Sequence, residues 1–159
     1  MRTDVLIIGG GLAGLALADR LAQRGVDFLV VEGADRFGGR VLSPMIHGAA
    51  FDLGPAWFWP GQPRIAALAR RLEIEWFEQY AQGDVVFQGE DGDAVRNRGF
   101  ASMQGSLRLE GGMAALIAGL GAGLPQDRWL LGAPVSALRR VDDGVAAAGF
   151  GGVDRKLTK

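Results

Sequence analysis

The sequence has 159 residues, which is the size of a single domain. With 48% hydrophobic and 22% charged residues it is predicted to fold as a globular protein, and 17 basic against 18 acidic side chains exclude a broad basic surface for nucleic acid. Cysteine is absent, which excludes disulfides and thiolate metal sites, and no apolar run is long enough for a signal peptide or a membrane span. We therefore expect a cytoplasmic protein without nucleic-acid or membrane partners.

The first thirty residues are predicted to form a βαβ unit. Residues 4–8 are an apolar, β-branched run typical of a buried parallel strand. Residues 12–24 carry leucine and alanine at helical spacing and end at Gly25, and residues 28–31 are a second buried strand. Because the crossover of such a unit is right-handed, the two strands are expected to be parallel neighbours.

The rest of the chain carries weaker patterns. Four prolines mark irregular loops after Val41, up to a short amphipathic helix. A Gly-Glu-Asp-Gly segment at 89–92 is typical of a hairpin turn, and a second helix follows a pair of glycines. The elements expected after Val41 are a helix at 65–72, a hairpin within 84–95, a helix at 113–120, strands at 129–131 and 135–141, and a turn at 142–144 that leads into a further strand.

A GxGxxG motif lies where the first strand meets the first helix. Gly9 would permit the tight turn, Gly11 would let the backbone approach a pyrophosphate, and Gly14 would let the helix pack close to the strand. Leu12 and Ala13 open the helix, whose free N–H groups and positive dipole end favour phosphate. The motif therefore predicts a dinucleotide site.

An acidic residue follows the second strand at the distance that such a site needs. Glu32 ends that strand about 20 residues after Gly11, where a carboxylate accepts hydrogen bonds from ribose hydroxyls and repels the 2′-phosphate of NADP. Gly33 and Ala34, which come next, are assigned to the same site. The alternative is that the glycines serve only a strand-to-helix turn, but strand, helix and Glu32 in one register favour the dinucleotide.

The segment after Glu32 favours FAD over NAD. Residues 36–40 read Arg-Phe-Gly-Gly-Arg, and the stretch 4–43 resembles the FAD fingerprint of the flavin amine oxidase superfamily. This superfamily includes monoamine and polyamine oxidases, renalase-like enzymes, protoporphyrinogen oxidases and carotenoid desaturases. Gly38 and Gly39 would admit backbone close to the pyrophosphate and ribityl chain, and Arg40 would add a permanent positive charge beside them. The alternative is a solvated arginine loop.

A second segment is similar to the family's Asp-Leu-Gly stretch, which passes the isoalloxazine ring. Pro55 stands where relatives often have a small residue. The aromatic residues at 57–59 either wall a substrate pocket or pack in a core, and the sequence leaves both interpretations open. The resemblance assigns to the cofactor site Leu53, Gly54, Pro55, Ala56 and Trp57.

The later part of the chain resembles the family more weakly. Glu110-Gly111-Gly112-Met113 opens a helix, and Pro134-Val135 follows it, as in the family segment whose valine lies near the adenine. The resemblance implies that Val135 binds that base through its backbone. His47 is the only histidine and is expected to be exposed or locally hydrogen-bonded. We identify no catalytic side chain and no metal-binding cluster.

The predicted fold class is α/β, a Rossmann-like FAD-binding βαβ domain with a small insertion that contains a β-hairpin, apparently truncated. We expect the domain to span residues 1–150, with part of a substrate domain inserted at about 60–108. Residues 151–159 are glycine-rich and then charged, and we expect a non-native or disordered tail there. Family members are considerably longer, so this chain alone is expected to be inactive.

The resemblance implies a small-molecule amine substrate, transfer of a hydride equivalent from an amine C–H to FAD, and oxygen as the acceptor. Two alternatives stay open. In the first, the chain is a non-catalytic nucleotide-binding fragment, whose exposed apolar surface would favour a homo-oligomer. In the second, the chain belongs to a porphyrinogen or carotenoid oxidase of the same superfamily.

Overall fold

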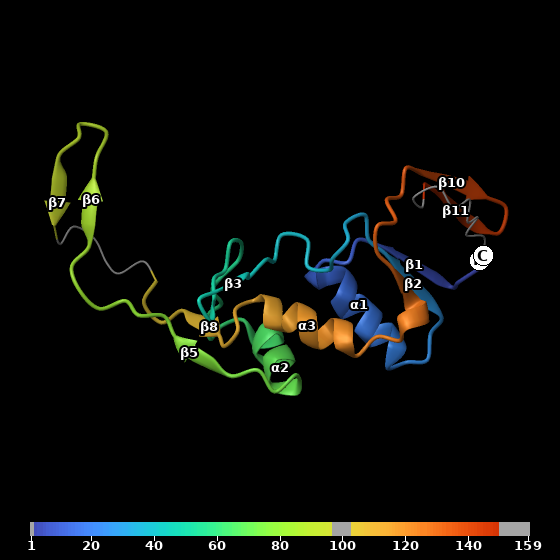
Figure 1. Ribbon diagram of the computed structural model, residues 1–159, viewed down its shortest axis with the longest axis horizontal. Coiled ribbons are helices and arrows are strands. Elements are labelled where there is room, and N and C mark those ends of the chain that lie inside the picture. The colour runs from blue at the N-terminus through green and yellow to red at the C-terminus, as the bar shows by residue number, and fades with distance from the viewer. Residues whose placement is uncertain (1, 97–102, 150–159) are drawn as a thin grey trace. The chain divides into compact units, whose positions relative to one another are not determined.

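The computed structural model describes residues 2–96 and 103–149, and the predicted tail at 151–159 lies outside the described residues. The chain divides into two compact units, one formed by Met1–Pro55 with Gly111–Lys159 and the other by Ala56–Glu110 (Figure 1). The assignment of residues about 60–108 to a substrate domain stays a prediction. Among the described residues, no helix has the length and apolar character that a bilayer crossing requires.

A three-stranded parallel sheet forms the centre of the first unit. Strand β1 (Val5–Ile8) pairs with β2 (Phe28–Val31), which pairs on its other side with β9 (Trp129–Leu130). Every residue of β2 is buried, as expected for a central parallel strand covered on both faces. The predicted βαβ unit and its parallel strand pairing are confirmed.

Two helices pack against each other beside this sheet (Figure 1). Helix α1 (Leu12–Ala22) connects β1 to β2 and is followed by Gly25, whose φ of 65° favours glycine. Helix α3 (Ala114–Ala122) is apolar around most of its surface and covers α1. The buried side chains that these helices contribute are Leu15, Ala18, Leu116, Ile117 and Leu120.

A β-hairpin contributes to a second core on the sheet. It consists of β10 (Ala137–Val141) and β11 (Gly144–Ala148), which pair antiparallel. Leu29 and Val31 of β2 pack there with Ala147 of the hairpin, whereas α1 contacts β1 and β2 elsewhere. Alternate residues of β2 thus serve two cores. The predicted strand at 135–141 begins two residues later than expected.

The segment after Val41 is an ordered two-stranded arm, whereas the sequence predicted irregular loops there. We call residues 42–53 the arm, and it contains β3 (Met45–Ile46) paired antiparallel with β4 (Ala49–Ala50). His47 and Gly48 form its turn with φ of 50° and 81°. Two consecutive positive φ values match the twist of a hairpin. His47 is exposed, as the sequence predicted.

The described residues of the second unit form one helix and four short strands. Helix α2 (Pro63–Arg71) begins at a proline, which suits the first helical turn, and lies near its predicted place. The predicted hairpin is present as β6 and β7, whereas the pairing of β5 with β8 was not predicted. In the first unit, the short 3-10 helix Gln126–Arg128 before β9 was not predicted either. The strands are β5 (Trp76–Glu78), β6 (Val86–Gln88), β7 (Ala94–Arg96) and β8 (Leu107–Leu109).

Phe58 is the centre of this second unit. Its backbone exchanges two hydrogen bonds with Leu107, at 3.0 and 2.7 Å. Its ring is 1% exposed and meets Trp76 edge to face at 6.2 Å between centroids, and the Arg70 guanidinium lies over the same indole. Phe58 is therefore a core residue, whereas its neighbours Trp57 and Trp59 are 42% and 41% exposed.

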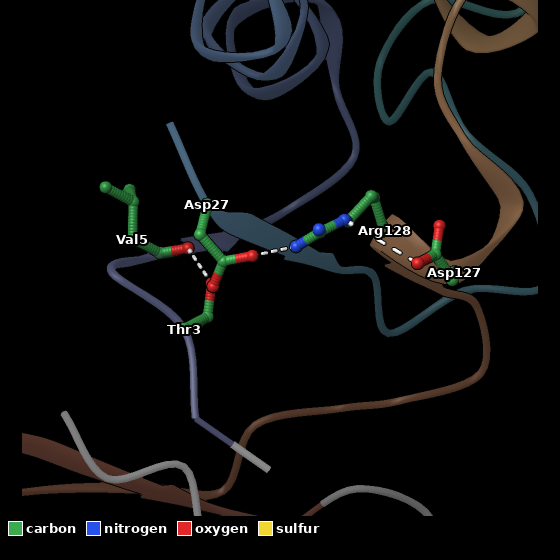
Figure 2. A network of polar contacts seen from close by, with 5 residues as sticks. All are labelled: Thr3, Val5, Asp27, Asp127 and Arg128. Carbon is green, nitrogen blue, oxygen red and sulfur yellow. Dashed lines mark hydrogen bonds and ion pairs between the residues drawn. The ribbon is translucent and has the colours of Figure 1, made fainter. Parts of the chain in front are cut away.

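An ion pair joins the ends of the sheet strands far from the glycine-rich turn. Asp27, just before β2, accepts a hydrogen bond from Arg128, just before β9, and Arg128 also lies near Asp127 (Figure 2). The Arg128 guanidinium, followed by the Thr3 hydroxyl, lowers the pKa of Asp27 below its ordinary value. The same contact raises the pKa of Arg128. The pair thus fastens β9 to β2.

We predict that Asp27→Asn lowers the melting temperature at neutral pH. A carboxyl whose pKa is lowered by folding contributes stability above its unfolded pKa, and this contribution is lost as the pH falls through the lowered value. Thermal melts across the acid range should therefore show a smaller loss for Asp27→Asn than for the wild type. Asp142→Asn, in the exposed turn between β10 and β11, is the control and should melt like the wild type. Equal acid slopes for wild type and Asp27→Asn would contradict the assignment.

Candidate functional site

The glycines of the turn between β1 and α1 differ in their surroundings: some contact other parts of the protein, and one adjoins open space. Gly9 has a φ of 105°, which favours glycine, and its N–H donates to the Val31 carbonyl at 2.8 Å. Gly14 contacts the same turn, because a Cβ on it would fall 2.0 Å from the Gly9 oxygen. This contact is the close strand-to-helix packing predicted for the third glycine of the motif.

Gly11 differs from these glycines, because no contact among the described residues requires a glycine there. Its backbone is extended, with a φ of −74°, and the nearest atom to a Cβ built on it is the Gly38 oxygen at 3.9 Å. Helix α1, which begins at Leu12 beside Ala13, has no side-chain cap and no acidic residue in its first turn. Its first N–H groups are therefore available to an anion, and the space at Gly11 fits the predicted pyrophosphate.

Glu32 is held by the backbone beside this turn. One carboxylate oxygen accepts the Gly10 N–H at 2.6 Å and the other accepts the Ala34 N–H at 2.8 Å. The two bonds fix the carboxylate, which keeps lone pairs for further donors such as ribose hydroxyls. The sequence predicted the position of this residue, but not its bond to the glycine turn. Its role toward ribose stays a prediction.

The chain after β9 lies along Glu32, Gly33 and Ala34. Ala133 N–H donates to the Glu32 carbonyl at 2.8 Å, and a Cβ on Gly33 would lie 3.6 Å from Pro134. The sequence placed Val135 on a strand near the adenine. Val135 instead lies two residues before β10, and its half-buried side chain packs against the core that includes Leu29 and Val31. Its place near the adenine stays a prediction.

Phe37 supports the glycine turn from inside the protein. A Cβ on Gly10 would fall 2.4 Å from the Phe37 ring, so Gly10 leaves room for it. The ring meets Trp129 of β9 edge to face, with centroids 5.3 Å apart. The backbone after it joins the turn as well, since Gly38 N–H donates to the Gly10 carbonyl at 2.9 Å. The two loops therefore form one surface.

Two arginines flank this loop in different ways. The Arg36 guanidinium donates to the carbonyls of Phe37, Gly39 and Val41 at 3.0, 3.1 and 3.3 Å. Arg40 is exposed, and within residues 2–96 and 103–149 its side chain has no hydrogen bond or ion pair. Arg36 thus holds the loop together, a role that the sequence did not predict, and the role of Arg40 toward the cofactor stays a prediction.

The predicted cofactor residues 53–57 fall in both units. A Cβ on Gly54 would lie 2.1 Å from the Arg40 carbonyl, so this glycine permits a close backbone crossing. Leu53 and Pro55, on either side of it, are exposed. Ala56 and Trp57 belong to the second unit, where Ala56 is buried and the Trp57 indole donates to Gln79 at 2.9 Å.

One polar cluster in the first unit was not predicted. The Asp52 carboxylate accepts hydrogen bonds from the Ser43 hydroxyl and from the Met113 N–H at the start of α3. The partners lie far apart in the sequence, so local patterns give no signal beyond the two glycines before Met113. Among the residues that the structure describes, no three His, Cys, Asp or Glu side chains gather as a metal site would require.

Comparisons with known proteins match these elements. A family model described as an NAD(P)-binding Rossmann-like domain matches residues 7–72. Putrescine oxidase of Kocuria rosea is 37% identical over 89 residues, covering 56% of this chain and 19% of that protein. Flavin-containing amine oxidase A of Canis lupus familiaris is 42% identical over 76 residues, covering 47% and 14%. The chain is thus similar to part of the flavin-containing amine oxidases.

Solved structures show the same fold. Putrescine oxidase bound to putrescine superposes with a TM-score of 0.80 at 19% identity, covering 99% of this chain and 56% of that chain. Cyclohexylamine oxidase from Brevibacterium oxydans gives 0.83 at 17% identity, with 98% and 56% covered. A fatty acid isomerase from P. acnes gives 0.72 at 18% identity, with 97% and 57% covered. The fold of the amine oxidases is thus shared with a protein of different chemistry.

The matches cover a fraction of each relative. The alignments span 14–19% of the curated amine oxidases cited above and 55–57% of the solved chains. The matched residues 7–72 contain the glycine turn, Glu32, the Arg36 loop and the arm. The roles of the individual cofactor residues stay predictions.

We predict unequal stability effects for two glycines of the same motif. Gly14→Ala should lower the free energy of unfolding by about 1–3 kcal/mol, because the new methyl group meets the Gly9 carbonyl. Gly11→Ala should change it by less than about 0.5 kcal/mol, since the methyl group enters open space. Urea unfolding of both variants measures the difference. Equal losses would show that Gly11 also serves internal packing.

Proposed function

We propose that the first unit binds FAD and that the chain is the FAD-binding portion of a flavin-dependent amine oxidase. The observation that carries this proposal is the open glycine turn. The space at Gly11, the uncapped start of α1 and the fixed carboxylate of Glu32 lie together, which is the set of groups that a dinucleotide needs.

Each half of the cofactor has candidate partners in this unit. The pyrophosphate would rest on the backbone from Gly9 to Gly14, with Leu12 and Ala13 N–H groups directed at it. Ribose hydroxyls would donate to Glu32, and the adenine would lie near Gly33 and Val135. Gly39 and Arg40 would accompany the ribityl chain, because the Arg40 charge is free of protein partners in the described part of the chain.

The amine substrate is proposed from the two relatives described above, which are amine oxidases at 37% and 42% identity. Bound FAD would accept a hydride equivalent from the carbon next to the amine nitrogen. Oxygen would be the final electron acceptor. The contribution of this chain is to bind and orient. The exposed backbone at Leu53–Gly54 would lie beside the flavin, and the second unit would form part of a substrate domain.

Another oxidoreductase of the same fold is the second candidate. The fatty acid isomerase shares the fold at a TM-score of 0.72, so the fold alone does not select the substrate. A porphyrinogen or carotenoid substrate, or a non-catalytic nucleotide-binding role, would use the same turn. The curated relatives favour the amine.

We predict that the purified chain binds FAD more tightly than NAD or NADP. The loop at 36–41 extends the binding surface beyond the glycine turn, and the Glu32 carboxylate repels the 2′-phosphate of NADP. Isothermal titration measures the three affinities. Gly11→Ala is the matched control, because it should fold normally yet weaken FAD binding by about tenfold or more through the added methyl group. Tight NAD binding without FAD binding would overturn the cofactor assignment.

The substrate class has its own test. Under anaerobic conditions, primary amines and diamines should bleach the visible absorption band of the FAD-loaded protein, while alcohols and fatty acids at the same concentration should not. The absorbance is followed over hours, so that even very slow reduction is detected. Slow reduction is expected because the chain aligns with 56% of the solved putrescine oxidase chain. Bleaching by fatty acids or porphyrinogens alone would favour the second candidate instead.

A further inference from the structure

The arm keeps one antiparallel register along its whole length. Leu53 N–H donates to the Leu42 carbonyl at 2.9 Å, and Phe51 N–H donates to the Pro44 carbonyl at 3.1 Å. The β3–β4 pairs continue the same register to the turn at His47. Ser43 and Asp52 are therefore opposite each other, on the face of the arm that α3 meets.

Ser43 and Asp52 together cap the start of α3, and we call this pair the clamp. Asp52 accepts the Ser43 hydroxyl at 2.6 Å and the Met113 N–H at 2.8 Å, while the Ser43 oxygen accepts the Ala114 N–H at 3.1 Å. Two N–H groups that helix formation leaves unpaired are thus satisfied by the arm. A carboxylate at this place also suits the positive end of the helix dipole.

The clamp is tightly enclosed. Gly112 has a φ of 74°, and a Cβ on it would fall 2.7 Å from the Asp52 carboxylate and 2.9 Å from the Ser43 hydroxyl oxygen. Any side chain at position 112 would push the arm away from α3. The geometry at this glycine therefore fixes the distance between the two elements.

A continuous set of contacts runs from the clamp to the glycine turn. The arm continues into Gly54, whose backbone crosses the Arg40 carbonyl with no room for a Cβ. Arg40 follows Gly38, which bonds to Gly10 and forms a β-bridge with Gly11. At the other end of this path, Glu32 accepts the Gly10 N–H, and the Ala133 N–H donates to the Glu32 carbonyl. A shift of the arm would thus act first on the 38–40 loop, which it meets directly at Gly54, and would reach Glu32 only through the glycine turn.

We propose that Ser43 and Asp52 are positioning residues for the flavin half of the cofactor. They set the arm, and through Gly54 the 38–40 loop, relative to the pyrophosphate turn. The face of the arm opposite the clamp carries the exposed apolar side chains Leu42, Ile46, Phe51 and Leu53, which the clamp holds in one orientation. This inference rests on the proposed FAD binding.

The test compares FAD with ADP, which contains only the adenosine half and the two phosphates. Asp52→Ala should weaken FAD binding about tenfold and ADP binding less than about twofold, both measured by titration calorimetry of the full chain. Ser43→Ala, a milder change, should shift the same ratio by about threefold. Asp52→Asn keeps an oxygen acceptor for both donors and should stay within about threefold of the wild type.

Asp27→Asn is the matched control, because it removes a carboxylate at the far end of the sheet and should leave the FAD to ADP ratio unchanged. Equal weakening of both ligands by Asp52→Ala and Ser43→Ala, or no change in either, would overturn the positioning role. A wild-type chain that binds neither ligand would overturn the proposed function and this inference with it. Binding of ADP without FAD would retain the nucleotide turn and overturn the clamp proposal.

Discussion

The first unit depends on the close approach of α1 to the end of β1. A single methyl group at position 14 would lie 2.0 Å from the Gly9 carbonyl oxygen, so there is no room for a side chain between the helix and the end of the strand. This contact places the helix N-terminus at the edge of the sheet where β1 and β2 end. Because parallel strands present their carboxyl ends at one edge, Glu32 at the end of β2 arrives beside the same turn. The chemistry of the site follows from this packing.

The other contacts preserve that arrangement. Leu29 and Val31 pack with the β10–β11 hairpin, which also carries the chain back along Glu32, while α1 and α3 pack beside the sheet. At the far end of the strands, the ion pair of Asp27 with Arg128 fastens β9. A mutation in any of these places would change the stability of the sheet and would not remove a group of the glycine turn itself.

The sequence predicted the elements whose signals are local. Residues 28–31 were placed without error, because a run of four apolar residues before an acidic one has few alternatives as a strand. The arm was missed, since its strands have two residues each and its turn is His-Gly instead of a common hairpin pair. The aromatic residues at 57–59 were left open, and only the packing of Phe58 on Trp76 separates core from surface.

The sequence also predicted only part of the candidate site. Glycine spacing predicted the turn, but not which glycine serves the protein and which leaves space for a ligand, because that depends on atoms from Gly38 and Phe37. The clamp joins residues 61 and 71 positions apart, so no window of sequence contains it.

The two arginines of the 36–40 loop show why residue type alone was insufficient. Both carry the same charge, and the resemblance assigned the ligand role to Arg40 without a role for Arg36. A guanidinium has five N–H donors in a planar fork, and Arg36 uses two of its nitrogens on three carbonyls of the loop. Its charge is thereby spread over dipoles that the loop itself supplies. Arg40 follows two glycines with positive φ and is exposed. The loop therefore carries two cations in different surroundings: the Arg36 guanidinium is bonded to loop carbonyls, and the Arg40 side chain is exposed.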